Sequence, residues 1–111
     1  MTATKQNNQS FLHVPDIREH SIVPPNGILS TTLQADERSK VVQFVFSAGQ
    51  ELSAHTAPCP AILFFAKGEA EVTLGEEIRP AAEGTFVHMA AKLPHAIRAK
   101  TEVVMLLVML K

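Results

Sequence analysis

The sequence contains no tryptophan and no tyrosine, and its one cysteine is Cys59. A single thiol excludes an intramolecular disulfide and any zinc site built from several cysteines. Without indole and phenol rings, only phenylalanine is left to stack on sugars or bases. Because the ten lysines and arginines are scattered and the net charge is −1, no basic stripe is available for a phosphate backbone. We therefore expect no nucleic-acid partner.

Long apolar runs are missing as well. The first residues, MTATKQNNQSF, include no apolar segment of the kind found in a signal peptide. The longest apolar run, Val103 to Leu110, is too short to span a bilayer and is typical of a strand buried on both faces. The sequence therefore predicts a cytoplasmic protein without a membrane partner.

Residues 1–27 have the composition of an irregular N-terminal arm. Three of the seven prolines lie between residues 14 and 27, and proline fixes its own φ and cannot donate to a strand ladder. The arm nevertheless carries apolar side chains that need burial: Phe11, Leu12, Val14, Ile17, Ile22 and Val23. They pack either against the rest of the chain or against a second subunit, and the sequence leaves both arrangements open.

Residues 28–111 alternate between short apolar segments and turn signals. ILSTTLQ and KVVQFVFS are rich in β-branched or aromatic residues, and ADERS separates them. PAILFFAKG, GEAEVTLGEEI, EGTFVHMA and PHAIRAK follow, and none of these segments has the apolar spacing of a helix. The pattern predicts an all-β domain, either an antiparallel sandwich or a barrel.

Two motifs in this domain combine glycine with histidine. Gly49 is followed after five residues by His55, and Gly68 closes the first motif; Gly84 opens the second, with His95 in register. They resemble the cupin motifs G-x5-H-x-H-x(3,4)-E-x6-G and G-x5-P-x-G-x2-H-x3-N. The first motif contains the residues HTAP and the second contains PH. In both respects the chain is similar to small single-domain bacterial cupins of the cupin 2 type. The resemblance implies an RmlC-like double-stranded β-helix, or jelly-roll, barrel over residues 28–111.

The same resemblance implies a metal site, but several of its positions have changed. Cupin metal sites use three histidines and one glutamate, whereas here Ala57 and Ala61 stand at two of those four positions. Three further family positions also differ: Ala90 replaces proline, Lys92 replaces glycine and Ala99 replaces asparagine. His55 and His95 remain as candidate ligands of a divalent ion (Fe, Mn, Zn or Ni), and two imidazoles alone form an under-liganded site.

Strand alternation suggests which residues surround the two histidines. If no bulge intervenes, His55, Cys59, Leu63 and Phe65 share one face, and Ile97 shares a face with His95. We expect these side chains to line a small-molecule pocket, with Cys59 available as a third, soft ligand. The alternative is that the histidines hydrogen-bond each other, a water or a backbone carbonyl in an apolar site.

The remaining polar residues favour surface roles. Alternation turns His88 away from its neighbours Val87 and Met89, which suggests an interface or surface position. His13 and His20 lie in the arm and are expected at the surface. A solvated strand face and turn are expected for four carboxylates: Glu69, Glu71, Glu76 and Glu77.

Three functions remain open from the sequence. The favoured hypothesis is a protein that binds a small molecule around His55 and His95, with no assigned reaction and at most weak metal binding. The alternatives are a metal-dependent enzyme, dioxygenase-like or isomerase-like, acting on a small organic substrate, and a structural dimer with a vestigial pocket. The apolar arm and the final apolar strand also favour a homodimer, with the N-terminal strands exchanged between subunits.

Overall fold

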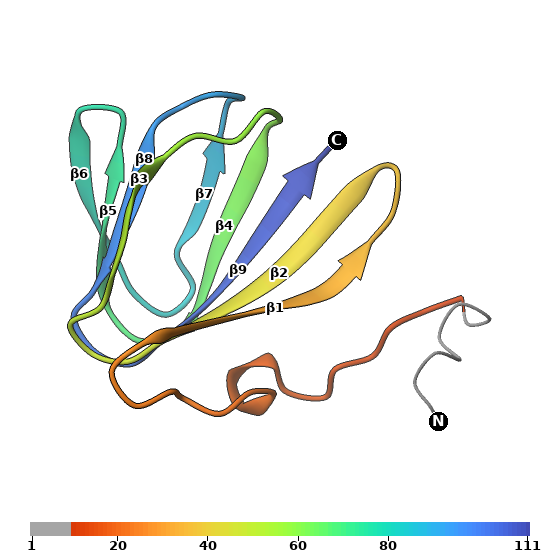
Figure 1. Ribbon diagram of the computed structural model, residues 1–111, viewed down its shortest axis with the longest axis horizontal. Helices are drawn as coiled ribbons and strands as arrows, with labels where there is room; N and C mark the ends of the chain where they lie inside the picture. The colour runs from red at the N-terminus through yellow and green to blue at the C-terminus, as the bar shows by residue number, and fades with distance from the viewer. Residues whose placement is uncertain (1–9) are drawn as a thin grey trace.

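The computed structural model describes residues 10–111, which are almost entirely β-sheet (Figure 1). One 3₁₀ turn precedes nine strands: η2 (Ile17–Glu19), β1 (Ile28–Ala35), β2 (Ser39–Phe46), β3 (Glu51–His55), β4 (Ala61–Lys67), β5 (Ala70–Leu74), β6 (Glu77–Ala81), β7 (Phe86–Met89), β8 (His95–Ala99) and β9 (Val103–Leu110). The prediction of an all-β fold is confirmed. Within the described residues, no helix has the length and apolarity needed to cross a membrane.

The strands form two antiparallel sheets that face each other. The five-stranded sheet has the order β1-β2-β9-β4-β7, and the four-stranded sheet has the order β3-β8-β5-β6. Among the strands of residues 10–111, only β1–β2 and β5–β6 are hairpins within one sheet, because every other connection passes from one sheet to the other. Segments distant in the sequence, such as β3 and β8, therefore become hydrogen-bonded neighbours, and this arrangement positions the candidate site.

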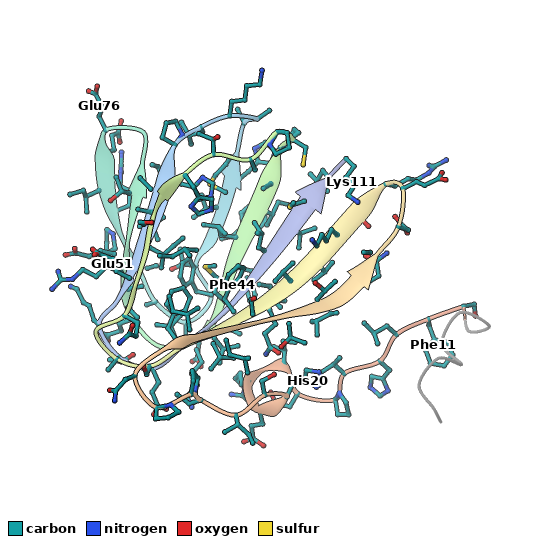
Figure 2. The ribbon with its side chains drawn as sticks, in the orientation of Figure 1. Phe11, His20, Phe44, Glu51, Glu76 and Lys111 are labelled. Carbon is teal, nitrogen blue, oxygen red and sulfur yellow. The ribbon has the colours of Figure 1, made fainter. Side chains whose placement is uncertain are left out.

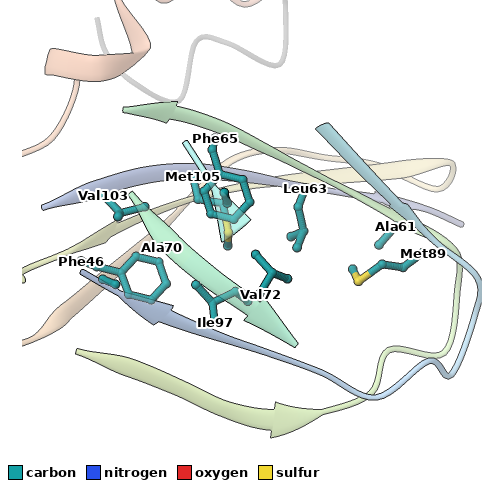
Figure 3. Packing of buried hydrophobic residues seen from close by; sticks show 12 residues of the cluster. Phe46, Ala61, Leu63, Phe65, Ala70, Val72, Met89, Ile97, Val103 and Met105 are labelled. Atoms are coloured by element: carbon teal, nitrogen blue, oxygen red, sulfur yellow. The ribbon is translucent and has the colours of Figure 1, made fainter. Parts of the chain in front are cut away.

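The hydrophobic core lies between the two sheets, as strand alternation requires. On β4 the side chain of Phe65 is fully buried, whereas that of Phe64 is 37% exposed on the opposite face. Phe46 and Phe65 from the five-stranded sheet meet Val72 and Ile97 from the four-stranded sheet (Figure 3). Burial of each large apolar side chain stabilises the fold by about 1.5–3 kcal/mol.

The arm packs on the outer face of the five-stranded sheet, the face turned away from the core (Figure 1). Its Ile17 and Val23 contact a small cluster made by Val45, Ala66 and Val104. The sequence left open whether the arm packs against its own chain or against a second subunit. This part of the arm packs against its own chain.

Gln43 is buried beneath the arm and links the arm to β2. Its side-chain Nε2 donates to the carbonyl of Ile17 at 2.7 Å, and Ser21 Oγ donates to its Oε1 at 3.1 Å. We expect Gln43→Ala to lower the free energy of unfolding by about 1–3 kcal/mol, because both arm groups lose their partner. Faster trypsin cleavage after Arg18 and a lower urea midpoint should report this change.

Gln50→Ala is the matched control for the Gln43 prediction. The hydrogen bonds recorded for Gln50 involve its backbone only, as donor to Ser47 and acceptor from Ala99. Its replacement should leave the cleavage rate at Arg18 near that of the unmodified protein. Equal cleavage rates in the two variants would contradict a tethering role for Gln43.

Candidate functional site

The structure brings the two motif histidines together. β3 and β8 are neighbours in the four-stranded sheet, and His55 is opposite His95 in their ladder. The centroids of the two imidazole rings are 4.3 Å apart, and the ring planes are inclined by 56°. Residues forty positions apart in the sequence thus form one imidazole pair, although their role as ligands is still a prediction.

A bulge in β3 sets the direction of the His55 ring. Leu52 is opposite Ile97 and His55 is opposite His95, so β3 has one residue more than β8 between these two pairs. An extra residue bends a strand and re-aims the side chain that follows it. As a result, the pair joins one buried ring, His95 at 3% exposure, to an exposed ring, His55, at the end of β3.

The hydrogen bonds of the two rings fix their tautomers. His55 Nδ1 lies 2.9 Å from the carbonyl oxygen of Ser53, and His95 Nδ1 lies 2.9 Å from that of Leu93. A carbonyl oxygen only accepts, so each Nδ1 carries the proton and donates it. In the neutral rings both Nε2 atoms then keep a free lone pair. The pair can accept a hydrogen bond from a ligand or donate electrons to a cation.

This donor set fits only part of a metal shell. Among residues 10–111, no three histidine, cysteine, aspartate or glutamate side chains lie close enough together to hold a metal ion. Cys59, the candidate third ligand, is half-buried in the connection between β3 and β4. Two Nε2 atoms match the incomplete ligation expected from the sequence, whereas tight structural sites use four protein donors.

The condition attached to the shared face does not hold, because His55 and Phe65 do not lie on one unbroken strand. β3 ends at His55 in the four-stranded sheet, and β4 begins at Ala61 in the five-stranded sheet. Alternation cannot persist across this crossover, which contains Pro58 and Pro60, because proline fixes φ and removes a backbone donor. Leu63, Phe65 and Ile97 nevertheless face the space between the sheets, where they are part of the hydrophobic core, and their role in lining a pocket stays a prediction.

A hollow lies beside the imidazole pair rather than over it. It has a volume of about 530 Å³ and opens between the β5–β6 hairpin and β7. Val72, Leu74 and Val87 give it apolar walls, and its lining does not include His55 or His95. Leu74, which lines the hollow, is the neighbour of His95 in the β5–β8 ladder.

Sequence reasoning missed Arg79 at this hollow, and it assigned Glu77 to a solvated strand face and turn rather than to the hollow. Arg79 is opposite Val72 and Glu77 is opposite Leu74 in the β5–β6 ladder, which places both on the sheet face turned toward the core. Their ion pair lowers the pKa of Glu77 and raises that of Arg79, chiefly through the side-chain hydrogen bond between them. Both side chains are 65% exposed, as the solvated-turn interpretation of Glu77 requires. The sequence signal that could have found this orientation is strand alternation, because Glu77, Arg79 and the buried Ala81 share one face of β6.

Lys92, in the loop between β7 and β8, has a strained backbone conformation. Its φ is 69°, a left-handed value that costs a non-glycine residue about 1–2 kcal/mol. Lys92 stands where the cupin motif has glycine, which explains the family's preference for that residue. The backbone N–H of Lys92 donates to the carbonyl of Ala57 at 2.8 Å, joining the β7–β8 and β3–β4 loops.

The other three histidines lie apart from the pair. His13 and His20 are exposed in the arm, and His88 is exposed on the outer face of β7. Sequence alternation correctly predicts the orientation of His88, since its neighbour Met89 is buried in the core.

No family model and no curated protein matches the chain. Solved structures do match: a conserved protein of unknown function from Streptococcus pyogenes has a TM-score of 0.82 and 32% identity, covering 95% of this chain and 92% of that one. A cupin 2 conserved barrel domain protein from Leptotrichia buccalis has a TM-score of 0.79 and 27% identity, covering 85% and 46%. A cupin superfamily protein from Desulfitobacterium hafniense has a TM-score of 0.81 and 23% identity, covering 87% and 88%.

These neighbours share the arrangement of two facing antiparallel sheets, which confirms the jelly-roll barrel expected from the motifs. The glycines that frame the motifs lie at turns with positive φ, at Gly49, Gly68 and Gly84, and the motif histidines meet across β3 and β8. By sequence motif, by topology and by its structural neighbours, the chain belongs to the cupin superfamily and is similar to its small bacterial members.

Proposed function

We propose that this cupin binds a small, largely apolar molecule and holds one polar group of that molecule with His55 and His95. The observation that carries the proposal is the pair of fixed tautomers. Each Nδ1–H is occupied by a backbone carbonyl, so both Nε2 atoms are acceptors without a recorded partner among the described residues. A ligand hydroxyl or another N–H or O–H donor satisfies that geometry.

The surroundings of the pair support an apolar ligand body. The hollow beside Leu74 is lined in part by the apolar side chains of Val72 and Val87, next to the Glu77–Arg79 ion pair, and falls in the size range of small-molecule pockets, about 300–1,000 Å³. His95 is almost fully buried, so a hydrogen bond to its Nε2 is shielded from water and gains strength. The ligand therefore combines a hydrogen-bond donor with a hydrocarbon or aromatic portion.

The test compares hydroxylated probes with their O-methyl ethers, for example small phenols and the matching anisoles. The phenols should raise the thermal midpoint, because a ligand that binds only the folded state stabilises it, by about 2.7 kcal/mol at 100 times Kd. The double variant His55→Ala/His95→Ala should abolish this rise and keep the circular dichroism spectrum of the barrel. Equal stabilisation by phenols and anisoles would contradict the proposed role of the Nε2 acceptors.

His20→Ala is the control for this experiment. His20 is an exposed histidine of the arm, and its removal should leave the response to the phenols unchanged. A loss of response in this variant would show that the effect does not depend on the imidazole pair.

The second candidate is a metal-dependent enzyme, dioxygenase-like or isomerase-like, acting on a small organic substrate. The same tautomers favour it, because histidines that ligate metals commonly donate their other N–H to a carbonyl. His55 and His95 would hold the ion, which would act as a Lewis acid toward the substrate. Untagged protein that retains one equivalent of Fe, Mn, Zn or Ni after dialysis, and loses it in the double histidine variant, would favour this candidate over the metal-free pocket.

The proposal also includes a homodimer, as the apolar arm suggests. Phe11 is 73% exposed and Leu12 is 57% exposed, and Phe11 lies far from the barrel (Figure 2). Large apolar side chains in this situation usually mark a surface that another chain covers.

A further inference from the structure

The inner face of the four-stranded sheet carries the imidazole pair and an ion pair in adjacent rows. Across β3, β8, β5 and β6, the ladders place four residues in one row: His55, His95, Leu74 and Glu77. The next row on the same face is made by Leu52, Ile97, Val72 and Arg79. Because residues directly opposite each other share a face of a sheet, the imidazoles and the Glu77–Arg79 pair lie on one surface.

The hollow opens over the β5 and β6 part of these two rows. Its lining includes Val72 and Leu74 from β5 and both members of the ion pair from β6. Neighbouring strands lie about 4.8 Å apart, so two strand spacings, about 10 Å, separate the backbones of β8 and β6. A molecule with one aromatic ring and a short side chain spans this separation, with its hydrocarbon portion over Leu74.

Glu77 occupies one edge of the Arg79 guanidinium and leaves the other edge open. Arg79 Nε donates to Glu77 Oε1 at 3.1 Å, and Nη2 donates to the same oxygen. Among residues 10–111, no partner is recorded for Nη1, so the edge formed by Nη1 and Nη2 keeps N–H donors for a ligand. Two parallel N–H groups on a planar guanidinium match the two oxygens of a carboxylate.

The charge of the hollow also favours an anion at this edge. Among the described residues of its lining, Arg79 is the one permanent cation, and the other ionisable groups are Glu77 and His88. The side-chain hydrogen bond to Glu77 raises the pKa of Arg79, so the guanidinium keeps its charge. Glu77 also restrains the guanidinium, which lowers the entropy that Arg79 loses when a carboxylate binds.

We propose that the molecule bound by this cupin is a hydroxy acid, with its hydroxyl at the imidazole pair and its carboxylate on the open edge of Arg79. The inference rests on the proposed function, because the same molecule uses the Nε2 acceptors of His55 and His95. It narrows the class of ligand, since a neutral phenol or alcohol uses the imidazole end of the surface and leaves the guanidinium without a partner.

Isothermal titration calorimetry with three probes tests the charge of the ligand: para-hydroxyphenylpropionate, its primary amide and para-hydroxyphenylpropylamine. At about pH 7 the propionate is ionised and the amide is neutral. The acid should bind at least about tenfold more tightly than the amide or the amine, because a bidentate bond between two charged groups is stronger than one to a neutral group. Arg79→Gln should remove this preference and bring the acid within about twofold of the amide.

Arg98→Gln is the matched control, because it removes the same charge from the other face of the same sheet. Arg98 is 60% exposed and is also paired with a glutamate, Glu71, at 3.7 Å. This variant should keep the preference for the acid. An equal loss of preference in Arg98→Gln and Arg79→Gln would overturn the proposal, because net charge rather than a specific contact would then explain the selectivity.

The other outcomes separate this inference from the proposed function. Equal affinities for acid and amide that both fall in the double variant His55→Ala/His95→Ala would overturn the hydroxy-acid inference and leave the imidazole pocket intact. Tighter binding of the amine would also overturn it, because Glu77 rather than Arg79 would then select the charge. Acid binding that depends on Arg79 but not on the two histidines would support the carboxylate site and contradict the proposed function.

Discussion

Gly68→Ala should destabilise the barrel by about 3–5 kcal/mol, through left-handed backbone strain together with a backbone clash. The φ of Gly68 is +92°, a value that residues with a side chain rarely adopt. A Cβ atom at this position would lie 2.0 Å from the carbonyl oxygen of Glu102 and 2.9 Å from Thr101 Oγ1. The β4–β5 turn and the start of β9 would have to separate, and urea unfolding monitored by circular dichroism measures the cost.

Gly84→Ala separates the two contributions to that cost. Gly84 has nearly the same φ, +93°, but a Cβ atom added there would meet nothing within 4 Å. Its replacement should cost about 1–2 kcal/mol from backbone strain alone. Equal destabilisation by the two substitutions would show that the contact with Glu102 is unimportant. The comparison also explains the closing glycine of the first cupin motif in this chain, because close approach of the backbone excludes any side chain at Gly68.

Phe65→Ala should also lower the free energy of unfolding by about 3–5 kcal/mol. The ring of Phe65 is fully buried at the centre of the core, where it packs with Phe46, Val72 and Met105 (Figure 3). Truncation removes the transfer free energy of the ring and leaves a cavity that two hydrogen-bonded sheets close only partly. Equilibrium unfolding in urea is the direct measurement, with the slope checked against that of the unmodified protein.

Phe64→Ala is the natural comparison, because Phe64 is the next residue and lies on the opposite face of β4. Its 37% exposure predicts a cost below about 1.5 kcal/mol in a single chain. The two variants should be compared at one fixed protein concentration, because any self-association would make the apparent stability depend on concentration. Similar losses for the two substitutions would contradict the assigned faces.

Local sequence patterns determine much of the barrel. β-Branched and aromatic segments separated by turn residues predict strands, and alternation along β4 predicts which phenylalanine is buried. Glycines at Gly49, Gly68 and Gly84 mark turns that need positive φ, and all three adopt it. These features depend on each residue and its near neighbours, so they can be recognised without knowing how the strands pair.

The candidate site depends on pairing that no local pattern contains. The cupin motifs suggest His55 and His95 together, but the bulge in β3 and the ladder between β3 and β8 set the distance between the rings and the exposure of each. The crossover at Pro58 and Pro60 moves the chain to the other sheet, so Leu63 and Phe65 face the interior from the sheet opposite His55 rather than from its own strand face. Glu77 and Arg79 reach the hollow for the same reason, through their ladder with β5.

The sequence by itself therefore determined the strand content, the turns and the two histidines, because backbone sterics and apolar alternation act over a few residues. The tertiary structure alone decided which strands are neighbours and how the imidazoles face each other. Those outcomes come from hydrogen bonding and burial between segments up to about seventy residues apart, as between β2 and β9, where register is set by packing rather than by local preference.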